Sequence, residues 1–353
     1  DHGVGDALSQ ARGAEVESFR HMWRRTFAIV AAFLSLFCGT AWCAQEQAVS
    51  GAKKEGSLVW YTAMQPEDSS KLIELYRGRY PFVDATSFRA GSAPLLNRIL
   101  TETRANRHLF DVVSGKFSDL MLLQKRDLLG KISAADWQFY PERFKDAGGR
   151  WVDLYHNYYT IAYNTDHVKP GDAPGKWDDL LDSKWSGGKI TIDPRSYDWY
   201  FGMRTLLGAQ KAQDYMRKLA AGKPAFRDGN VLIANLLAAG EFPVAVTYAH
   251  LVERLRARGA PVDWVAVKPM IAVPISLALP QRAPHPSAAA LFADLVLGKD
   301  GAEMLKAMGR LPTRSDVTPS AKRLDPKSLD LLPLRVSSDE MEPEEFRGLF
   351  GLR

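Results

Sequence analysis

Short apolar runs alternate with amphipathic stretches along most of the chain, which predicts a regular succession of strands and helices. The runs Leu58–Tyr61, Val83–Phe88 and Phe110–Val113 have the length and composition of buried strands. Between and after them, apolar residues recur at three- and four-residue spacing, as on the buried face of a helix. Helices are therefore expected at Asp68–Tyr80, Leu95–Leu100 and Ser118–Arg126. Such an alternation indicates a parallel sheet with helices on its faces.

The same alternation returns in the second half of the chain. Strands are expected at Gly187–Pro194, Val244–Tyr248, Val262–Val267 and Ile271–Leu279. Helices are expected at Trp177–Leu181, Val231–Ala239, Ala249–Arg258, Ala288–Leu297 and Gly301–Met308. Two such series on roughly 300 residues fit two lobes with separate cores. The residues from Pro319 onward are rich in proline and charge, and they are expected to wrap loosely over the surface.

The stretch Trp151–Thr165 alternates like a strand, yet both of its faces carry polar side chains. We interpret it as a first crossover between two lobes, with Val262–Val267 and Ile271–Leu279 together as the return crossover. An edge strand with one face in water fits this segment alone equally well. The series of strands and helices on either side favours the crossover. A ligand is then expected in a cleft beside it, where Tyr158 would contact it.

The first 44 residues have the pattern of an export signal rather than of a folded element. A short basic region begins at Met22 and leads into the apolar run Thr26–Phe37. The residues that follow fit cleavage after Ala41, Cys43 or Ala44. The run is shorter than the roughly 20 apolar residues that a spanning helix needs. Residues before Met22 are interpreted as an upstream extension of the reading frame.

Charge and cysteine content narrow the class of protein. Both cysteines, Cys38 and Cys43, fall in the leader, so no internal disulfide is expected even though export would permit one. The leader carries four basic and four acidic residues, and the rest of the chain keeps the formal charge of +5. This excess fits an anionic ligand. Nucleic acid is disfavoured because no basic run is interleaved with aromatic residues. An enzyme is disfavoured because hydrolase motifs such as Gly-x-Ser-x-Gly are absent.

The carboxyl ends of the first three strands are the places where a parallel sheet binds ligands. The residues expected to contact a ligand there are Thr62, Ala63, Arg89, Gly91, Ser92 and Ser114. The stretch from Arg89 to Ser92 is the strongest candidate for an anion-binding element. It offers a guanidinium, a hydroxyl and the start of a helix, each of which can bind an anion. Ser92 as an ordinary helix N-cap is the simpler alternative.

An aromatic patch is expected at the strand ends of the second series. The residues expected to bind ligand there are Arg195, Tyr197, Trp199, Tyr200 and Tyr248. Aromatic rings with polar tips offer rigid surface for recognising a small molecule. Trp199 as a core residue is the alternative. Phe201 is expected to point inward, and His250 to be a helix-cap or surface residue.

A set of short motifs has a specific order and spacing along the chain. After the leader come Ser57–Met64 (SLVWYTAM), Ile161–Thr165 (IAYNT), Trp177–Leu181 (WDDLL) with Lys184-Trp185, Leu236–Glu241 (LLAAGE), Gly259–Val262 (GAPV) and Ala283–Ala289 (APHPSAA). In this order they resemble the iron(III)-type, or family 1, extracellular solute-binding proteins of ABC importers. Each motif is weak alone, and together they cover nearly all of residues 56–316.

This resemblance implies a two-lobed periplasmic binding protein fold of type II, in which each lobe is a mostly parallel sheet flanked by helices. The lobes would comprise residues 56–158 with 270–318 and residues 159–269, between the leader at 1–44 and a tail at 319–353. The resemblance also implies a monomeric periplasmic protein without enzymatic activity. It would close on a small solute by hinge motion and deliver it to an ABC permease. A protein that serves a sensor would have the same sequence features.

The resemblance also bears on the ligand. Ferric-binding members present two adjacent tyrosines, usually with a histidine and an acid, whereas the matching stretch Thr247–His250 has one tyrosine. A small anionic organic solute, such as a phosphonate, a phosphorylated compound or a carboxylate, is therefore favoured, with Arg89, Ser92 and Arg195 holding its charge. No cofactor is expected. Ferric iron is the alternative, with Tyr248 and either Tyr197 or Tyr200 as its ligands.

Overall fold

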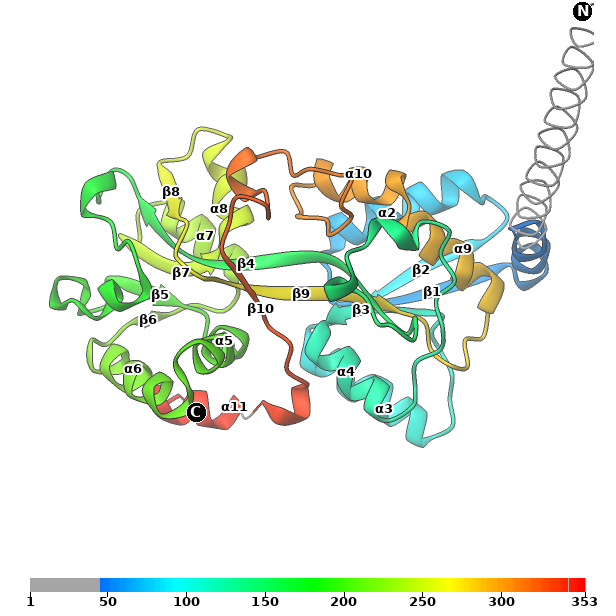
Figure 1. Cartoon of the computed structure of the whole chain (residues 1–353), viewed down its shortest axis with the longest axis horizontal. Coiled ribbons are helices and arrows are strands. Elements are labelled where there is room, and N and C mark those ends of the chain that lie inside the picture. The colour runs from blue at the N-terminus through cyan, green and yellow to red at the C-terminus, as the bar shows by residue number, and fades with distance from the viewer. Residues whose placement is uncertain (1–44, 342, 353) are drawn as a thin grey trace, which may run out of the picture.

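Two long strands join the two lobes of the molecule (Figure 1). The structure is a computed structural model that describes residues 45–341 and 343–352. The predicted leader and both cysteines lie outside these residues. The joining strands are β4 (Val152–Asn164) and β9 (Met270–Ala278), which run antiparallel to each other. Within the described ranges, no helix has both the length and the apolar character to cross a membrane.

The first lobe is built on three parallel strands in the order β2-β1-β3. These strands are β1 (Ser57–Thr62), β2 (Asp84–Arg89) and β3 (Val112–Lys116). The helices of this lobe include α2 (Pro66–Arg79), α3 (Ser92–Arg104), α4 (Phe117–Lys125), α9 (Pro286–Leu297) and α10 (Lys299–Ala307), with short turns at η1 (Trp137–Phe139) and η2 (Glu142–Phe144). Residues 45–55, before β1, are helical as well. Leu58 and Trp60 belong to one buried cluster and Tyr61 to another, as side-chain alternation along a strand requires. Both faces of the sheet are therefore covered, as predicted.

The second lobe repeats this plan on the parallel strands β6-β5-β7. Its strands are β5 (Ile190–Ile192), β6 (Ala225–Phe226), β7 (Val244–Tyr248) and β8 (Val262–Val265). Its helices are α5 (Tyr197–Leu207), α6 (Ala209–Ala221), α7 (Asn230–Ala238) and α8 (Ala249–Arg256), with short turns at η3 (Pro170–Asp172), η4 (Trp177–Leu181) and η5 (Ser183–Trp185). A single large buried cluster fills this lobe.

Strand β4 runs through both lobes and is buried along its whole length, which confirms the crossover and excludes an edge strand with one face in water. Its first half pairs with β9 and its second half with β7 and β8, all antiparallel. Every one of its residues is buried, including the polar ones. The buried carboxylate of Asp153, for example, accepts hydrogen bonds from His156 Nε2 at 3.0 Å and Ser276 Oγ at 2.6 Å. Strand β9 also pairs with β3, so it is the return crossover. The prediction was wrong for Val262–Val267, because β8 pairs with the second half of β4 and stays in the second lobe.

The C-terminal residues are packed into the fold, so the expectation of a loosely wrapped tail is wrong. Strand β10 (Leu331–Pro333) pairs in parallel with β9. Helix α11 (Pro343–Phe350) lies against α5 and α6 in Figure 1, and its Phe346 is fully buried. Although the tail is rich in proline and charge, it also contains apolar residues at the spacing of a short helix. These residues are buried against the second lobe.

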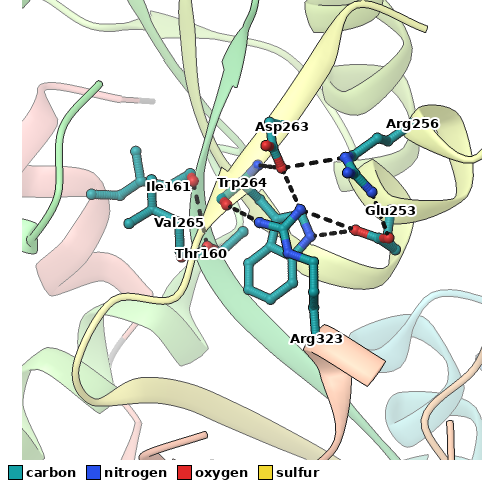
Figure 2. Close-up of polar contacts among 8 residues, drawn as sticks. All are labelled: Thr160, Ile161, Glu253, Arg256, Asp263, Trp264, Val265 and Arg323. Carbon is teal, nitrogen blue, oxygen red and sulfur yellow. Dashed lines mark hydrogen bonds and ion pairs between the residues drawn. The ribbon is translucent and has the colours of Figure 1, made fainter. Parts of the chain in front are cut away.

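The tail begins with an anchor on strand β8 of the second lobe (Figure 2). Arg323, in the turn η6 (Lys322–Leu324), donates hydrogen bonds to Asp263 Oδ1 at 2.6 Å and to the backbone oxygen of Trp264 at 2.9 Å. Its guanidinium also lies 4.5 Å from the centre of the Trp264 ring. This contact fixes the path of the chain before it reaches β10.

Candidate functional site

The strand ends of the first lobe meet as predicted, and their hydroxyls bind each other. Thr62 Oγ1 and Ser114 Oγ lie 2.8 Å apart, and both residues are fully buried. The Trp60 indole donates to Ser114 Oγ at 3.1 Å, and the backbone N–H of Ala63 donates to the Ser114 carbonyl oxygen at 3.2 Å. Thr62 and Ser114 therefore fix the geometry of these strand ends.

Arg89, Gly91 and Ser92 stand next to this pair. Arg89 is in register with Thr62 across β1 and β2, and it is exposed. Helix α3 begins at Ser92 with Gly91 as its N-cap, and no side chain caps it. The interpretation of Ser92 as an ordinary N-cap is therefore wrong, and its hydroxyl and the free N–H groups of the first turn remain available to a ligand.

An ion pair between the lobes is the feature that sequence reasoning missed. Lys116, the last residue of β3, pairs through Nζ with the carboxylate of Asp198 in the first turn of α5. The Asp198 side chain is 2% exposed and that of Lys116 is 25% exposed. Lys116 follows Ser114-Gly115 directly, so its position at the end of a predicted strand could have identified it as a site residue. Its partner is 82 residues away in the chain, and only folding brings the two together.

Asp119 adds a second carboxyl beside this ion pair. Burial raises its pKa, the positive charge of Lys116 partly offsets this, and the negative charge of Asp198 raises it further, to about 6. The site between the lobes therefore holds one ammonium group and two carboxyl groups. The charges of this site therefore differ from the prediction, in which Arg89 and Arg195 were the charged residues.

Tyr248 stands at the end of β7, as predicted, and it has an unpredicted partner in Tyr159. The two residues are opposite each other in the β4–β7 register, and their hydroxyls are 3.5 Å apart. Tyr159 also donates to Ser196 Oγ at 3.3 Å. Burial raises the pKa of Tyr248 to about 12 and the pKa of Tyr159 well above its usual value. Both phenols are therefore protonated at neutral pH.

Tyr158, which was expected to line the cleft, lies elsewhere. Successive side chains of a strand point to opposite faces, so Tyr158 points away from Tyr159. Its ring is 6.3 Å from that of His156, and it is buried. The tyrosine that this strand contributes to the site is Tyr159.

The aromatic patch after β5 faces the core and the tail instead of gathering around Tyr248. Trp199 is fully buried, with ring centres 5.7 Å from Trp177 and 6.4 Å from Tyr215, so the interpretation as a core residue is correct for it. The rings of Tyr197 and Tyr200 pack 5.7 Å and 5.9 Å from Phe346 of α11. Phe201 is buried, as expected.

Arg195 lies next to this aromatic stretch, and it is held by Asp193. Its backbone N–H donates to Asp193 Oδ1 at 2.9 Å, and its Nε lies 3.5 Å from the same oxygen. The side chain of Arg195 remains 58% exposed. It is therefore accessible, although its charge is partly balanced.

His250 is a buried residue of a second contact between the lobes, so its expected role as a cap or surface residue is wrong. Its Nε2 accepts a hydrogen bond from Arg310 Nη1 at 3.3 Å, and Arg310 forms a buried ion pair with Asp68 of α2. Its ring stacks on that of Tyr248, with centres 5.9 Å apart. Burial and the cations Arg310 and Arg254 hold the pKa of His250 well below its ordinary value. It is therefore a neutral acceptor.

The described residues contain no group of three or more His, Cys, Asp or Glu side chains that could hold a metal ion. A cavity of about 250 Å³ lies in the second lobe among η4, η5 and α6, and Trp185, Lys218 and Leu219 are among its lining residues. None of the residues expected to bind a ligand lines this cavity. The polar groups that meet between the lobes are therefore the candidate site.

Comparison with known proteins gives one family match and a broad structural likeness. A profile of the family described as "Bacterial extracellular solute-binding protein" matches residues 109–333. The search of curated proteins gives no match. The family match ends at Pro333, before the chain reaches α11.

Solved structures of similar fold cover most of this chain. Iron-bound HitA from Pseudomonas aeruginosa is 18% identical, with a TM-score of 0.72 over 84% of this chain and 98% of that one. The periplasmic binding protein AfuA from Actinobacillus pleuropneumoniae, with fructose-6-phosphate bound, is 23% identical, with a TM-score of 0.71 over 84% and 97%. A structure described as the Atu4243-GABA receptor is 18% identical, with a TM-score of 0.67 over 83% and 97%. At these identities the likeness establishes the fold alone, a two-lobed binding protein of type II.

Proposed function

Because the chain belongs to the family of bacterial extracellular solute-binding proteins, we propose that it is the substrate-binding component of an ABC uptake transporter. It captures a small solute in the periplasm and delivers it to transmembrane permease subunits, and it catalyses no reaction. The two bodies that close on the solute are residues 56–158 with 270–318 and residues 159–269. The predicted leader accounts for export.

The observation that carries the proposal is the ion pair between Lys116 and Asp198. It joins the carboxyl end of β3 in one lobe to the start of α5 in the other. Strand ends of this kind are where α/β sheets bind ligands. A polar solute that enters between the lobes takes the place of one or both partners, so this pair marks the solute position.

The charges around the ion pair define the class of solute. An anionic group that binds Lys116 leaves Asp198 without its cation, and an unpaired buried carboxylate is costly. The solute must therefore also offer hydrogen-bond donors, either hydroxyls or an ammonium group, to Asp198 and Asp119. Phosphorylated sugars and amino acids meet both conditions. The ligands named for AfuA and for the GABA receptor, fructose-6-phosphate and GABA, belong to these two classes.

Arg89 and Ser92 supply a further anion-binding element in the first lobe. The guanidinium is exposed, and the first turn of α3 has no side-chain cap. A phosphate or carboxylate at this helix start gains both the N–H groups and the positive end of the helix dipole. Arg195 is the corresponding cation of the second lobe.

Ferric iron remains a second candidate, and the phenol pair favours it. The segment Thr247–His250 contains one tyrosine, whereas ferric-binding members have two adjacent ones. Tyr159 supplies the second phenol here, because its hydroxyl lies 3.5 Å from that of Tyr248. HitA, a structure of similar fold, is iron-bound. Against iron stands the ammonium group of Lys116, whose positive charge acts on Tyr248.

A thermal-melt screen of the chain from Gln45 onward tests these alternatives. The panel pairs fructose 6-phosphate with fructose, GABA with butylamine and with butyrate, and ferric citrate with citrate. A solute at about 100 times its dissociation constant adds about 2.7 kcal/mol of stability. We expect a shift for a compound that carries both an anionic group and donors, and none for its single-function counterpart.

Two variants separate site binding from a general charge effect. Lys116→Gln is expected to abolish the shift, whereas Lys71→Gln, the same change on the exposed side of α2, is expected to retain it. A shift that survives Lys116→Gln would contradict the proposed site. A shift with ferric citrate alone would replace the organic solute with iron.

A further inference from the structure

The C-terminal residues after β10 touch both lobes, and their path crosses the candidate site. We propose that residues 334–341 and 343–352 form a strap that holds the two lobes together beside this site and must release helix α4 of the first lobe before a solute enters. The inference rests on the proposed function, because it assumes that the solute binds between the lobes. These residues follow the last residue of the family match. The name "C-terminal strap" is used for them below.

One end of the C-terminal strap is fixed to the first lobe near the crossover. The Arg335 guanidinium donates to Asp153 Oδ2 at 2.5 Å and to Asp153 Oδ1 at 3.3 Å. It also lies 4.4 Å from the centre of the Phe117 ring and 5.4 Å from that of Trp151. Asp153 is fully buried, so this end is firmly held.

The next turn, η7 (Ser338–Glu340), rests on α4 of the first lobe. Lys125 Nζ lies 2.6 Å from Glu340 Oε1 and 3.2 Å from Asp339 Oδ1. These ion pairs are exposed, because the side chains of Lys125 and Asp339 retain 42% and 45% of their accessible surface. Exposed pairs of this kind are weak and are screened by salt.

The other end of the C-terminal strap is buried on the second lobe. Phe346 is fully buried against Tyr197 and Tyr200. Glu345 accepts from Arg204 Nη1 at 2.6 Å and from Gln213 Nε2 at 2.5 Å. Burial of a phenylalanine is stronger than exposed ion pairs. The contact between η7 and α4 is therefore the one that opens first.

The part of the strap that opens rests on α4, which carries Asp119 and follows Lys116 directly. The Ser338 hydroxyl lies beside the Asp119 carboxyl, and Asp119 neighbours both Lys116 and Asp198. Figure 1 shows the chain leaving β10, passing between α4 and α5, and ending under α6. The strap therefore connects α4, which follows Lys116 directly, with α5, which carries Asp198. Release of η7 from α4 uncovers the site, and the strap then stays attached to the first lobe through Arg335, next to the crossover strand β4.

Distances between spin labels on the two lobes test the strap without any solute. The chain from Gln45 onward contains no native cysteine, so Arg104→Cys on α3 and Lys211→Cys on α6 give two specific label positions, both exposed. In the parent we expect one narrow distance distribution. In Lys125→Glu, where the strap faces a negative charge, we expect a severalfold larger population at longer distance. High salt should lengthen the distance in the parent in the same way.

A charge swap and a neighbouring control make the test specific. Lys125→Glu combined with Asp339→Lys and Glu340→Lys restores the ion pairs in reverse and should restore the narrow distribution. Arg126→Glu makes the same change one residue away, at an arginine for which the structure gives no ion pair to the strap, and should leave the distance unchanged. The inference is overturned if Lys125→Glu and salt have no effect, if the swap fails to restore the distance, or if Arg126→Glu acts equally. A solute screen that fails beside a positive distance result rejects the proposed ligand and leaves the strap intact.

Discussion

Tyr159 and Tyr248 face each other across β4 and β7 with their hydroxyls 3.5 Å apart, although 89 positions separate them in the chain. The pair sits where β4 passes from the first lobe into the second. The sequence indicated Tyr248 alone, whereas the structure places the phenol of Tyr159 beside it. The predictions below concern this site and the buried charges around it.

Ferric citrate is expected to produce no visible phenolate-to-iron absorption with this protein at pH 7. Both phenols hold their protons, since burial raises the pKa of Tyr248 to about 12, and the Lys116 ammonium repels a trivalent cation. Absorption spectra during a ferric citrate titration measure this. An absorption band that is lost in Tyr248→Phe and in Tyr159→Phe, but kept in Tyr163→Phe, would establish an iron site instead.

Lys116→Gln is expected to lower the free energy of unfolding by about 2 kcal/mol, because it leaves the Asp198 carboxylate buried without its cation. Adding Asp198→Asn removes this unpaired charge and should recover much of the loss. Urea unfolding of the two single variants, the double variant and the parent measures the coupling, expected at about 1–2 kcal/mol. Additive effects would mean that the pair does not hold the lobes together.

Alanine at Arg89 or at Ser92 is expected to weaken solute binding severalfold while leaving the melting temperature of the free protein nearly unchanged. Arg89 is exposed, and the structure gives Ser92 no capping hydrogen bond whose loss would destabilise α3. Titration calorimetry with the compound that gives the largest melt shift measures the affinity. Equal affinity in parent and variants would remove both residues from the site.

His250 is expected to make the protein less stable as the pH falls below about 6.5. The unfolded chain takes up a proton on this histidine near its ordinary pKa, whereas burial and two arginines keep the folded form neutral. The loss between pH 7.5 and pH 5.5 is about 1.4 kcal/mol. Urea unfolding should show a smaller pH effect in His250→Gln, whose amide oxygen accepts from Arg310 without titrating. The exposed His167→Gln serves as the control, and an equal change in both variants would contradict the assignment.

Asp119 is expected to act in the opposite direction. Its pKa is raised to about 6 in the folded protein, so the folded state holds the extra proton between its ordinary pKa and 6, and stability declines as the pH rises through this window. Relative to the parent, Asp119→Asn should therefore gain about 2 kcal/mol between pH 4.5 and pH 7. Urea unfolding at these two pH values tests this, and a pH-independent difference between variant and parent would contradict the raised pKa.

The periodic pattern of the sequence was sufficient to predict the strands, the helices and their order. Apolar runs such as Leu58–Tyr61 and Val244–Tyr248 became buried strands, and the helices after them appeared near the predicted residues. The stretch Trp151–Thr165 became the crossover β4. These predictions succeed because an element that is buried on one or two faces needs apolar residues at a regular spacing. This spacing is visible in the sequence.

The tail shows where composition misled. Proline and charge around Pro319 suggested a loose segment, yet Phe346 is fully buried in α11. The aromatic rings of Tyr197 and Tyr200 were assigned to the ligand because nothing in the sequence indicated that this helix would cover them. A few apolar residues with a complementary surface outweigh the average character of a segment.

The sequence by itself determined the fold class, the order of the elements and the strand ends at which Thr62, Arg89 and Ser114 gather. Only the tertiary structure decided which side chains meet at the site, namely Lys116 with Asp198 across the lobes and Tyr159 with Tyr248 within the second lobe. The physical reason is that strand and helix periods arise from neighbours along the chain. The ion pair and the phenol pair join residues more than 80 positions apart, and no local pattern encodes such contacts.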